Sequence, residues 1–170
     1  STKIDRLVPR SKNNPALMLN SVSSSLNRLN VKCIDVCYLH QNEIDIISDK
    51  YIHQGIFILK DKHLIKKIGT SVYSEEELKY TLDSGIYDWV QIPINILDTS
   101  FYNMIGDNKI KVAARSVFLQ GILLDKKSIM SNISNNTDMI DLLETVEDLC
   151  KHYSISVQEL SIAYLSSLNK

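Results

Sequence analysis

Short β-rich segments alternate with longer segments of helical periodicity, and this alternation constrains the fold more than any other feature of the chain. Strands are predicted at Thr2–Ile4, Ile34–Leu39, Lys67–Val72, Trp89–Ile92 and Ile110–Ala114. These segments are nearly continuous in apolar character, which is typical of parallel strands buried on both faces. The pattern therefore predicts an α/β fold in which helices cover a parallel sheet.

The segments between the strands are predicted to be helical, because apolar residues recur there every three or four positions. The predicted helices are Pro15–Leu29, Lys50–Lys60, 75–84, Asp138–His152 and 157–168. The residues expected on the buried face of the first helix are Leu17, Leu19, Val22, Leu26 and Leu29.

Two of these helices begin with a capping box, formed by Ser74 with Glu77 and by Ser156 with Glu159. In this motif the serine hydroxyl accepts from the third helical N–H, and the glutamate reaches back to the serine N–H. Gly85 is expected to follow the end of the third helix in the left-handed conformation.

The length leaves two architectures open. A (β/α)8 TIM barrel normally takes about 250 residues, whereas this chain has 170. A five-stranded doubly wound sheet fits that length without a missing piece. The pattern of elements alone does not choose between them.

The charge balance excludes some partners. With 19 Lys+Arg against 20 Asp+Glu, the chain has no basic excess to neutralise phosphates, so we expect neither nucleic acid nor an anionic membrane as a partner. No apolar run reaches the roughly 18 residues that a membrane-spanning helix needs. The segment Ser1–Arg6 lacks the apolar core of a signal peptide. We therefore expect a cytoplasmic protein.

Three cysteines, Cys33, Cys37 and Cys150, do not form a disulfide framework. On one strand, Cys33 and Cys37 would lie about 13 Å apart, which is too far for a disulfide. Neither has a second Cys or a His at metal-ligand spacing, so we expect no metal site.

Six short motifs follow one another along the chain, and their order is more specific than any one of them. They are Thr2-Lys3, Ser25-Leu26-Asn27-Arg28-Leu29, Ile34-Asp35-Val36-Cys37-Tyr38-Leu39-His40, Ile68-Gly69-Thr70-Ser71-Val72, Val90-Gln91-Ile92-Pro93-Ile94-Asn95 and the stretch from Val112 to Gly121. This succession resembles the aldo-keto reductase family and spans nearly the whole chain.

The resemblance implies an incomplete (β/α)8 TIM barrel made of about strands 3 to 7 with their helices, in a single domain over residues 1–170. The family's first two strands, with its catalytic Tyr and Asp, and its eighth strand have no counterpart here. It also implies NADP(H) or NAD(H) as cofactor and the reversible reduction of a small carbonyl substrate. Since a cut barrel has unpaired edge strands, we expect either additional chain or a homo-oligomer that pairs them.

The resemblance assigns catalytic roles to Lys3 and His40. Lys3 matches the family's Lys, whose ammonium lowers the pKa of the catalytic Tyr. His40 ends an apolar strand, where a neutral imidazole can donate a hydrogen bond to a carbonyl oxygen. From residue type alone, a solvated lysine and a hydrogen-bonded loop histidine are the commoner roles. Asp35, at the start of the His40 strand, is expected to hold backbone or a cation.

Four residues match cofactor-binding positions of the family. Ser71 and Gln91 match those that hold the nicotinamide carboxamide, and their hydroxyl and amide groups suit its donor and acceptor. Relatives usually have Asn where this chain has Val72. Arg115 replaces a Tyr that stacks on the nicotinamide ring, and its guanidinium can stack or pair with a phosphate or an acidic substrate. Ser116 matches the family's Ser.

Two functions stay open at this point. One is an NAD(P)-dependent aldo-keto reductase represented by its central part. The other is a truncated, non-catalytic relative that binds a ligand or partner, which the missing Tyr, Asp and eighth strand favour for the chain taken literally.

Overall fold

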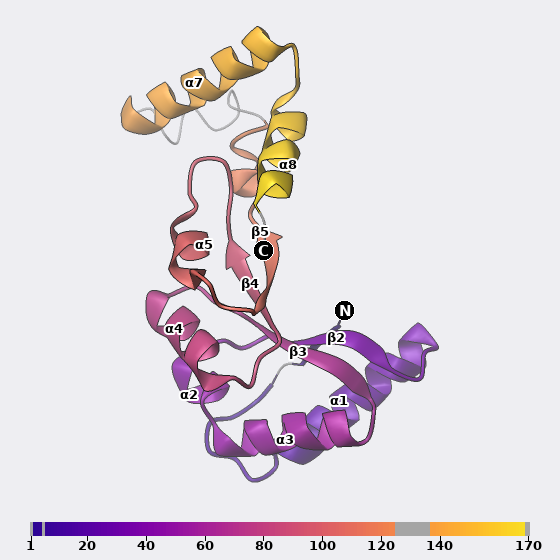
Figure 1. Ribbon diagram of the computed structural model, residues 1–170. Helices are drawn as coiled ribbons and strands as arrows, with labels where there is room; N and C mark the ends of the chain where they lie inside the picture. Colours follow the sequence, from indigo (N-terminus) through magenta and orange to yellow (C-terminus); the bar gives the residue numbers. More distant parts are fainter. Residues whose placement is uncertain (1, 5, 125–136, 169–170) are drawn as a thin grey trace. The chain divides into compact units, whose positions relative to one another are not determined.

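The computed structural model describes residues 2–4, 6–124 and 137–168. Its strands are β1 (Thr2–Ile4), β2 (Ile34–Leu39), β3 (Ile65–Ser71), β4 (Trp89–Pro93) and β5 (Lys111–Arg115). Its helices are α1 (Asn14–Leu29), α2 (Ile44–Ile47), α3 (Lys50–Asp61), α4 (Glu75–Ser84), α5 (Ser100–Ile105), α7 (Thr137–Tyr153) and α8 (Val157–Ser167), with a short 3-10 turn at Leu119–Gly121 (Figure 1).

The strands form one sheet in the order β1-β2-β3-β4-β5, and the pairs β1–β2, β2–β3 and β3–β4 are parallel. This spatial order follows the chain without a reversal. A doubly wound sheet has a switch point at which the order reverses and carries helices on both faces. Here α1 and α3 pack against each other and lie on the same side of β2 and β3 (Figure 1). The doubly wound alternative is therefore excluded.

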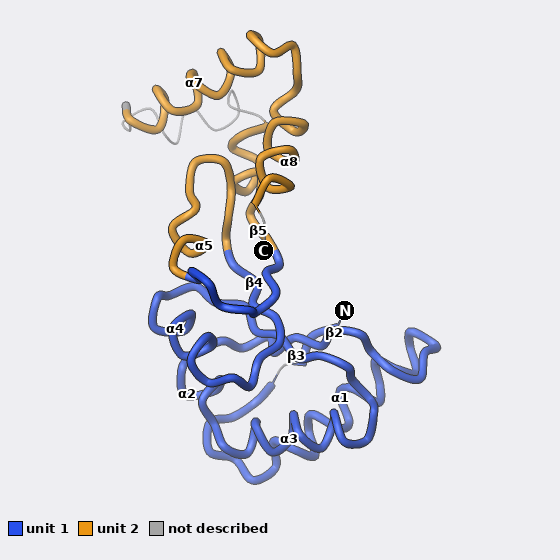
Figure 2. Tube along the Cα trace, viewed as in Figure 1, with its two compact units in different colours: residues 1–92, 105–113 blue, residues 93–104, 114–170 orange. Residues whose placement is uncertain are grey.

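The chain divides into two compact units (Figure 2). The first comprises residues 1–92 and 105–113, and the second comprises residues 93–104 and 114–170. In the second unit, α7 contacts α8, and Leu123, Leu143, Val146 and Cys150 are buried.

In the first unit, the sheet has two different faces, because side chains alternate along each strand. We call the face toward α1 and α3 the helix-covered face. Its residues Ile4, Cys37, Leu39, Ile68, Val90 and Ile92 are all completely buried. The intervening positions form what we call the opposite face, which includes Lys3, Tyr38, His40, Lys67, Gly69, Ser71, Trp89 and Gln91.

Gly69 allows a close contact on the opposite face. A Cβ atom at this position would lie 2.5 Å from Cε1 of Tyr38 and 3.1 Å from Cβ of Trp89. The Tyr38 ring therefore occupies the space that a side chain at position 69 would fill, and Tyr38 is only 7% exposed as a result.

The local signals identified in the sequence are present. Ser74 and Ser156 each form a complete capping box, with Glu77 and Glu159 respectively. Gly85 ends α4 with a φ of 64° in the left-handed region. The prediction for α1 was partly wrong, because Leu17 and Leu29 are exposed, whereas Met18 is completely buried.

Candidate active site

Ser71 and Gln91 lie beside each other at the carboxyl end of the β3–β4 pair. The two residues are register partners on these neighbouring strands, and the Ser71 hydroxyl donates to Oε1 of Gln91 at 3.4 Å. Ser71 is 3% exposed, and Gln91 is half-buried. A hydroxyl and a side-chain amide are thus presented together on the opposite face of the sheet.

Val72 extends this pairing by one residue, since its N–H donates to the carbonyl oxygen of Gln91 at 3.0 Å. Its side chain is completely buried and is apolar, so it offers neither a donor nor an acceptor. The β3–β4 pair therefore offers a hydroxyl and a side-chain amide, followed by an apolar side chain at Val72.

Lys3 and His40 lie at the carboxyl ends of two other neighbouring strands. Lys3 is the register partner of Tyr38, and the His40 N–H donates to the carbonyl oxygen of Ile4 at 2.7 Å. Since His40 follows Tyr38 by two residues, Lys3 and His40 belong to the same face. Both side chains are exposed.

The loops after β1 and β2 are joined by a side chain that the sequence analysis missed. Gln41, directly after His40, binds the backbone of Leu7 through both ends of its amide. Its Nε2 donates to the Leu7 carbonyl at 2.9 Å, and its Oε1 accepts from the Leu7 N–H. In the sequence, Gln41 is visible only as a polar residue directly after a strand, and this position alone does not indicate a contact with Leu7.

A second amide joins the loops after β2 and β3. Asn42 donates to Oε2 of Glu77 at 2.9 Å, and the same oxygen accepts from the N–H groups of Tyr73 and Ser74. The loops beyond β1, β2 and β3 are therefore tied together at the strand ends that carry Lys3, His40 and Ser71.

Arg115 and Ser116 belong to the second unit. Arg115, the last residue of β5, is half-buried, and its Nη1 donates to the Ser116 hydroxyl at 3.4 Å. The Ile94 N–H donates to the Arg115 carbonyl at 3.0 Å. Ser116 has a φ of 57°, so the chain turns sharply as it leaves the strand.

A comparison with known families decides which class of protein this is. The model of the aldo/keto reductase family matches residues 1–170. The chain belongs to this family. The five strands with their helices match part of the (β/α)8 barrel of aldo-keto reductases.

Individual aldo-keto reductases resemble the chain at low identity. An NADH-specific methylglyoxal reductase of Escherichia coli K12 is 24% identical over an alignment of 169 residues, and the match covers 89% of this chain and 52% of that protein. A glycerol dehydrogenase of Gluconobacter oxydans superposes with a TM-score of 0.68 and 18% identity, over 89% of this chain and 51% of that one. An aldo-keto reductase of Bacillus halodurans superposes with a TM-score of 0.59 and 25% identity, over 71% of this chain and 41% of that one. The chain thus spans about half the length of the methylglyoxal reductase.

The ionisable groups around β2 differ in environment. Burial raises the pKa of the Cys37 thiol to about 12, which keeps it protonated and unreactive at neutral pH. Burial also raises the pKa of Tyr38. At the start of β2, Asp35 pairs with Lys66 at 2.6 Å. This agrees with the expectation that Asp35 holds backbone or a cation.

Two further findings concern ligands and membranes. Among residues 2–4, 6–124 and 137–168, no group of three or more His, Cys, Asp or Glu side chains is arranged to hold a metal ion. In the same ranges, every helix is too short or too polar to cross a membrane.

Proposed function

We propose that this chain carries part of the active site of an NAD(P)H-dependent reductase, which reduces an aldehyde or ketone and can oxidise the alcohol in reverse. The observation that supports this most is the Ser71–Gln91 pair, with 3.4 Å between the hydroxyl and the amide oxygen. The pair lies on the same face of the sheet as Lys3 and His40.

The Ser71–Gln91 pair suits a nicotinamide carboxamide. That group has an acceptor oxygen and a donor NH₂, and a hydroxyl together with a side-chain amide can satisfy both. Their mutual hydrogen bond is long for one between two oxygen-bearing groups, so a ligand can replace it at little cost. When bound, the reduced cofactor supplies the hydride for the carbonyl carbon.

Lys3 and His40 act on the carbonyl oxygen in this proposal. The His40 imidazole donates a hydrogen bond to that oxygen and orients the substrate. The Lys3 ammonium lowers the pKa of the family's catalytic Tyr, which gives the proton to that oxygen and has no counterpart in this chain. Arg115 and Ser116 are proposed as further cofactor contacts, with the guanidinium stacking on a ring or pairing with a phosphate.

We assign β1–β5 to the third to seventh strands of the family barrel and treat residues 1–170 as one domain. The order of the motifs and the family match over residues 1–170 support this assignment. The three cysteines are free, which agrees with a reducing compartment such as the cytoplasm. The name of the E. coli relative makes NADH and methylglyoxal the first cofactor and substrate to test.

A non-catalytic relative that binds the nucleotide without turnover is the second candidate. The completely buried Val72, at a position where family members usually have Asn, favours it because one contact to the carboxamide is lost.

The test is an NADH titration of the purified chain, followed by an assay of NADH oxidation with methylglyoxal. Gln91→Met removes both amide hydrogen bonds at nearly constant volume, and we expect it to weaken NADH binding about tenfold. Gln54→Met, on the exposed surface of α3, is the matched control and should bind like the parent chain.

Three outcomes are informative. Binding with turnover supports the reductase. Binding without turnover supports the cofactor site alone, because both candidates predict it for a chain without the family's catalytic Tyr. If NADH does not bind, or binds equally well to Gln91→Met, the Ser71–Gln91 pair is not the cofactor site.

A further inference from the structure

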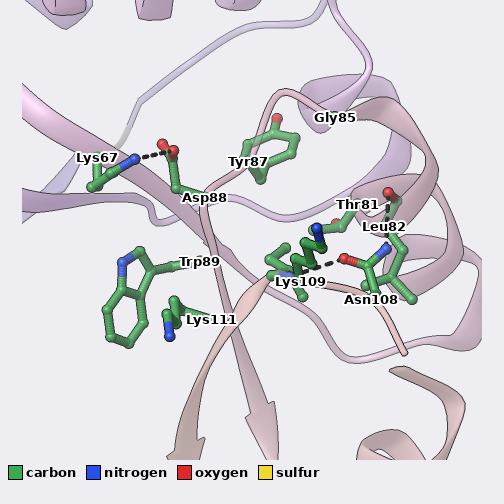
Figure 3. A pocket seen from close by; sticks show the side chains of 11 residues that line it. Lys67, Thr81, Leu82, Gly85, Tyr87, Asp88, Trp89, Asn108, Lys109 and Lys111 are labelled. Atoms are coloured by element: carbon green, nitrogen blue, oxygen red, sulfur yellow. Dashed lines mark hydrogen bonds and ion pairs between the residues drawn. The ribbon is translucent and has the colours of Figure 1, made fainter. Parts of the chain in front are cut away.

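A cavity of about 400 Å³ opens in the first unit near the amino ends of β4 and β5. The residues that matter for its chemistry are Lys67, Asp88, Trp89, Asn108, Lys109 and Lys111 (Figure 3). Its size lies within the range of small-molecule sites. Trp89 and Lys111 begin their strands, whereas Ser71 and Gln91 lie nearer the carboxyl ends, so this cavity is separate from the proposed cofactor contacts.

The register of the sheet brings a tryptophan and lysines together here. Trp89 is the register partner of Gly69, and Lys67 precedes Gly69 by two residues on the same face. The Lys111 N–H donates to the Asp88 carbonyl at 3.1 Å, which places Lys111 beside Trp89 on the next strand. Figure 3 shows Trp89 and Lys111 lying together, with Lys109 closer to Asn108.

The charges that line the cavity are unbalanced. Three lysines line it, and Asp88 is its only carboxylate within the described ranges. Asp88 already serves two ammonium groups, because its oxygens lie 2.9 Å from Nζ of Lys67 and 2.8 Å from Nζ of Lys60. In the described part of the chain, neither Lys109 nor Lys111 has an ion pair with a carboxylate. The cavity therefore has an excess of positive charge.

The walls of the cavity are held by hydrogen bonds of their own. Oδ1 of Asn108 accepts from the Ile110 N–H at 3.0 Å, and Ile110 is buried between the two exposed lysines. The hydroxyl of Tyr87, another lining residue, donates to the Ile47 carbonyl at 2.7 Å. A ligand would thus meet a largely formed site and would need to order only the lysine side chains.

We propose that this cavity binds a small multivalent oxyanion of the phosphate-ester class. Ammonium groups bind phosphate oxygens as compact point charges with three donors each. A concave site with an excess of one sign of charge concentrates counter-ions, and a bound anion would offset the repulsion between the lysines. The proposal concerns a second site and does not depend on the proposed reductase activity.

Trp89, the single tryptophan of the chain, reports on this cavity directly. The experiment titrates the chain with inorganic pyrophosphate at constant ionic strength, followed by tryptophan fluorescence and by calorimetry. We expect a saturable signal, with Lys109→Gln and Lys111→Gln each weakening the affinity about tenfold, as expected for a lost hydrogen bond to a charged group.

Lys79→Gln is the matched control, because Lys79 is exposed on α4 outside the cavity and the substitution removes the same charge. It should bind pyrophosphate like the parent chain, and so should Gln91→Met. The proposal is overturned if neither fluorescence nor heat shows saturable binding. It is equally overturned if Lys79→Gln weakens binding as much as Lys109→Gln does, because the attraction would then come from net charge alone.

Discussion

The two faces of the sheet in the first unit differ in burial and in the kind of side chain that they carry. On the helix-covered face, Ile4, Leu39, Ile68 and Ile92 are completely buried. On the opposite face, Lys3 and His40 are exposed, and Gln91 is half-buried. Neighbouring residues of one strand thus have different environments.

This difference follows from the alternation of side chains along a strand. The face against α1 and α3 must exclude water, and so it is apolar. The other face carries hydroxyl, amide, imidazole and ammonium groups. Neither α1 nor α3 covers this face, so its polar groups are not forced out of water. The candidate active site lies on the opposite face, whereas the lysine-lined cavity is also bordered by Thr81 and Leu82 of α4.

The largest expected effect compares adjacent residues of β4. Ile92→Ala on the helix-covered face should reduce the free energy of unfolding by about 2–5 kcal/mol, since it leaves a cavity in the core. Gln91→Ala on the opposite face should cost less than about 1.5 kcal/mol, through the loss of one hydrogen bond. Urea denaturation of both variants measures the contrast. Equal losses of unfolding free energy would show that the two faces contribute equally to stability.

Gly69 provides an exception on the opposite face. Gly69→Ala should reduce the free energy of unfolding by about 1–3 kcal/mol through overpacking, because the new Cβ would lie 2.5 Å from the Tyr38 ring. The measurement is a double-mutant cycle with Tyr38→Ala.

In the Tyr38→Ala background, Gly69→Ala should be neutral or stabilising, since alanine loses less backbone entropy on folding than glycine. An unchanged penalty would mean that Trp89 or the backbone, rather than the Tyr38 ring, requires the glycine.

Much of the fold could be predicted because its signals are local. The bounds of β2 agree with the predicted Ile34–Leu39, and the two capping boxes use residues only three positions apart. The order of the strands depends on contacts distant in sequence. For this reason, the pattern alone left the barrel and the doubly wound sheet equally open.

The buried face of α1 shows why periodicity of apolar residues was insufficient. Asn14 and Ser25 lie on this face because their polar groups are satisfied there. The Asn14 amide binds both the N–H and the carbonyl of Val8, and the Ser25 hydroxyl accepts from Thr2 at 3.1 Å. Leu17 and Leu29, which the periodicity placed inside, are 42% and 54% exposed.

The candidate site was predictable where local motifs mark its residues. The Ser71–Gln91 pair follows from two motifs on neighbouring strands, and the structure brings the two residues together. Gln41 was missed because its partner, Leu7, lies 34 positions earlier in the chain, and no local pattern marks such a contact.

The smallest expected effect concerns Asp88, at the edge between the two faces. Burial raises the pKa of this carboxyl, but hydrogen bonds from Lys60, the Ile68 N–H and Lys67 outweigh it, so the pKa lies below its usual value. Because the folded state then releases the proton more readily than the unfolded chain, the carboxylate stabilises the fold above about pH 4, the pKa of an unperturbed Asp. This stabilisation is lost as the pH falls through the folded-state pKa.

Asp88→Asn should therefore reduce the free energy of unfolding by roughly 1 kcal/mol at pH 7, and the difference from the parent chain should vanish in acid. Urea denaturation at pH values from neutral to acid measures this difference in unfolding free energy.

Asp35→Asn is the control, since Lys66 also lowers the pKa of Asp35, but in an ion pair whose side chains are 64% and 79% exposed. Water and salt screen such a pair, so the control should show no measurable change. If Asp88→Asn is equally silent, or if its deficit persists in acid, the ion pairs at Asp88 do not stabilise this edge of the sheet.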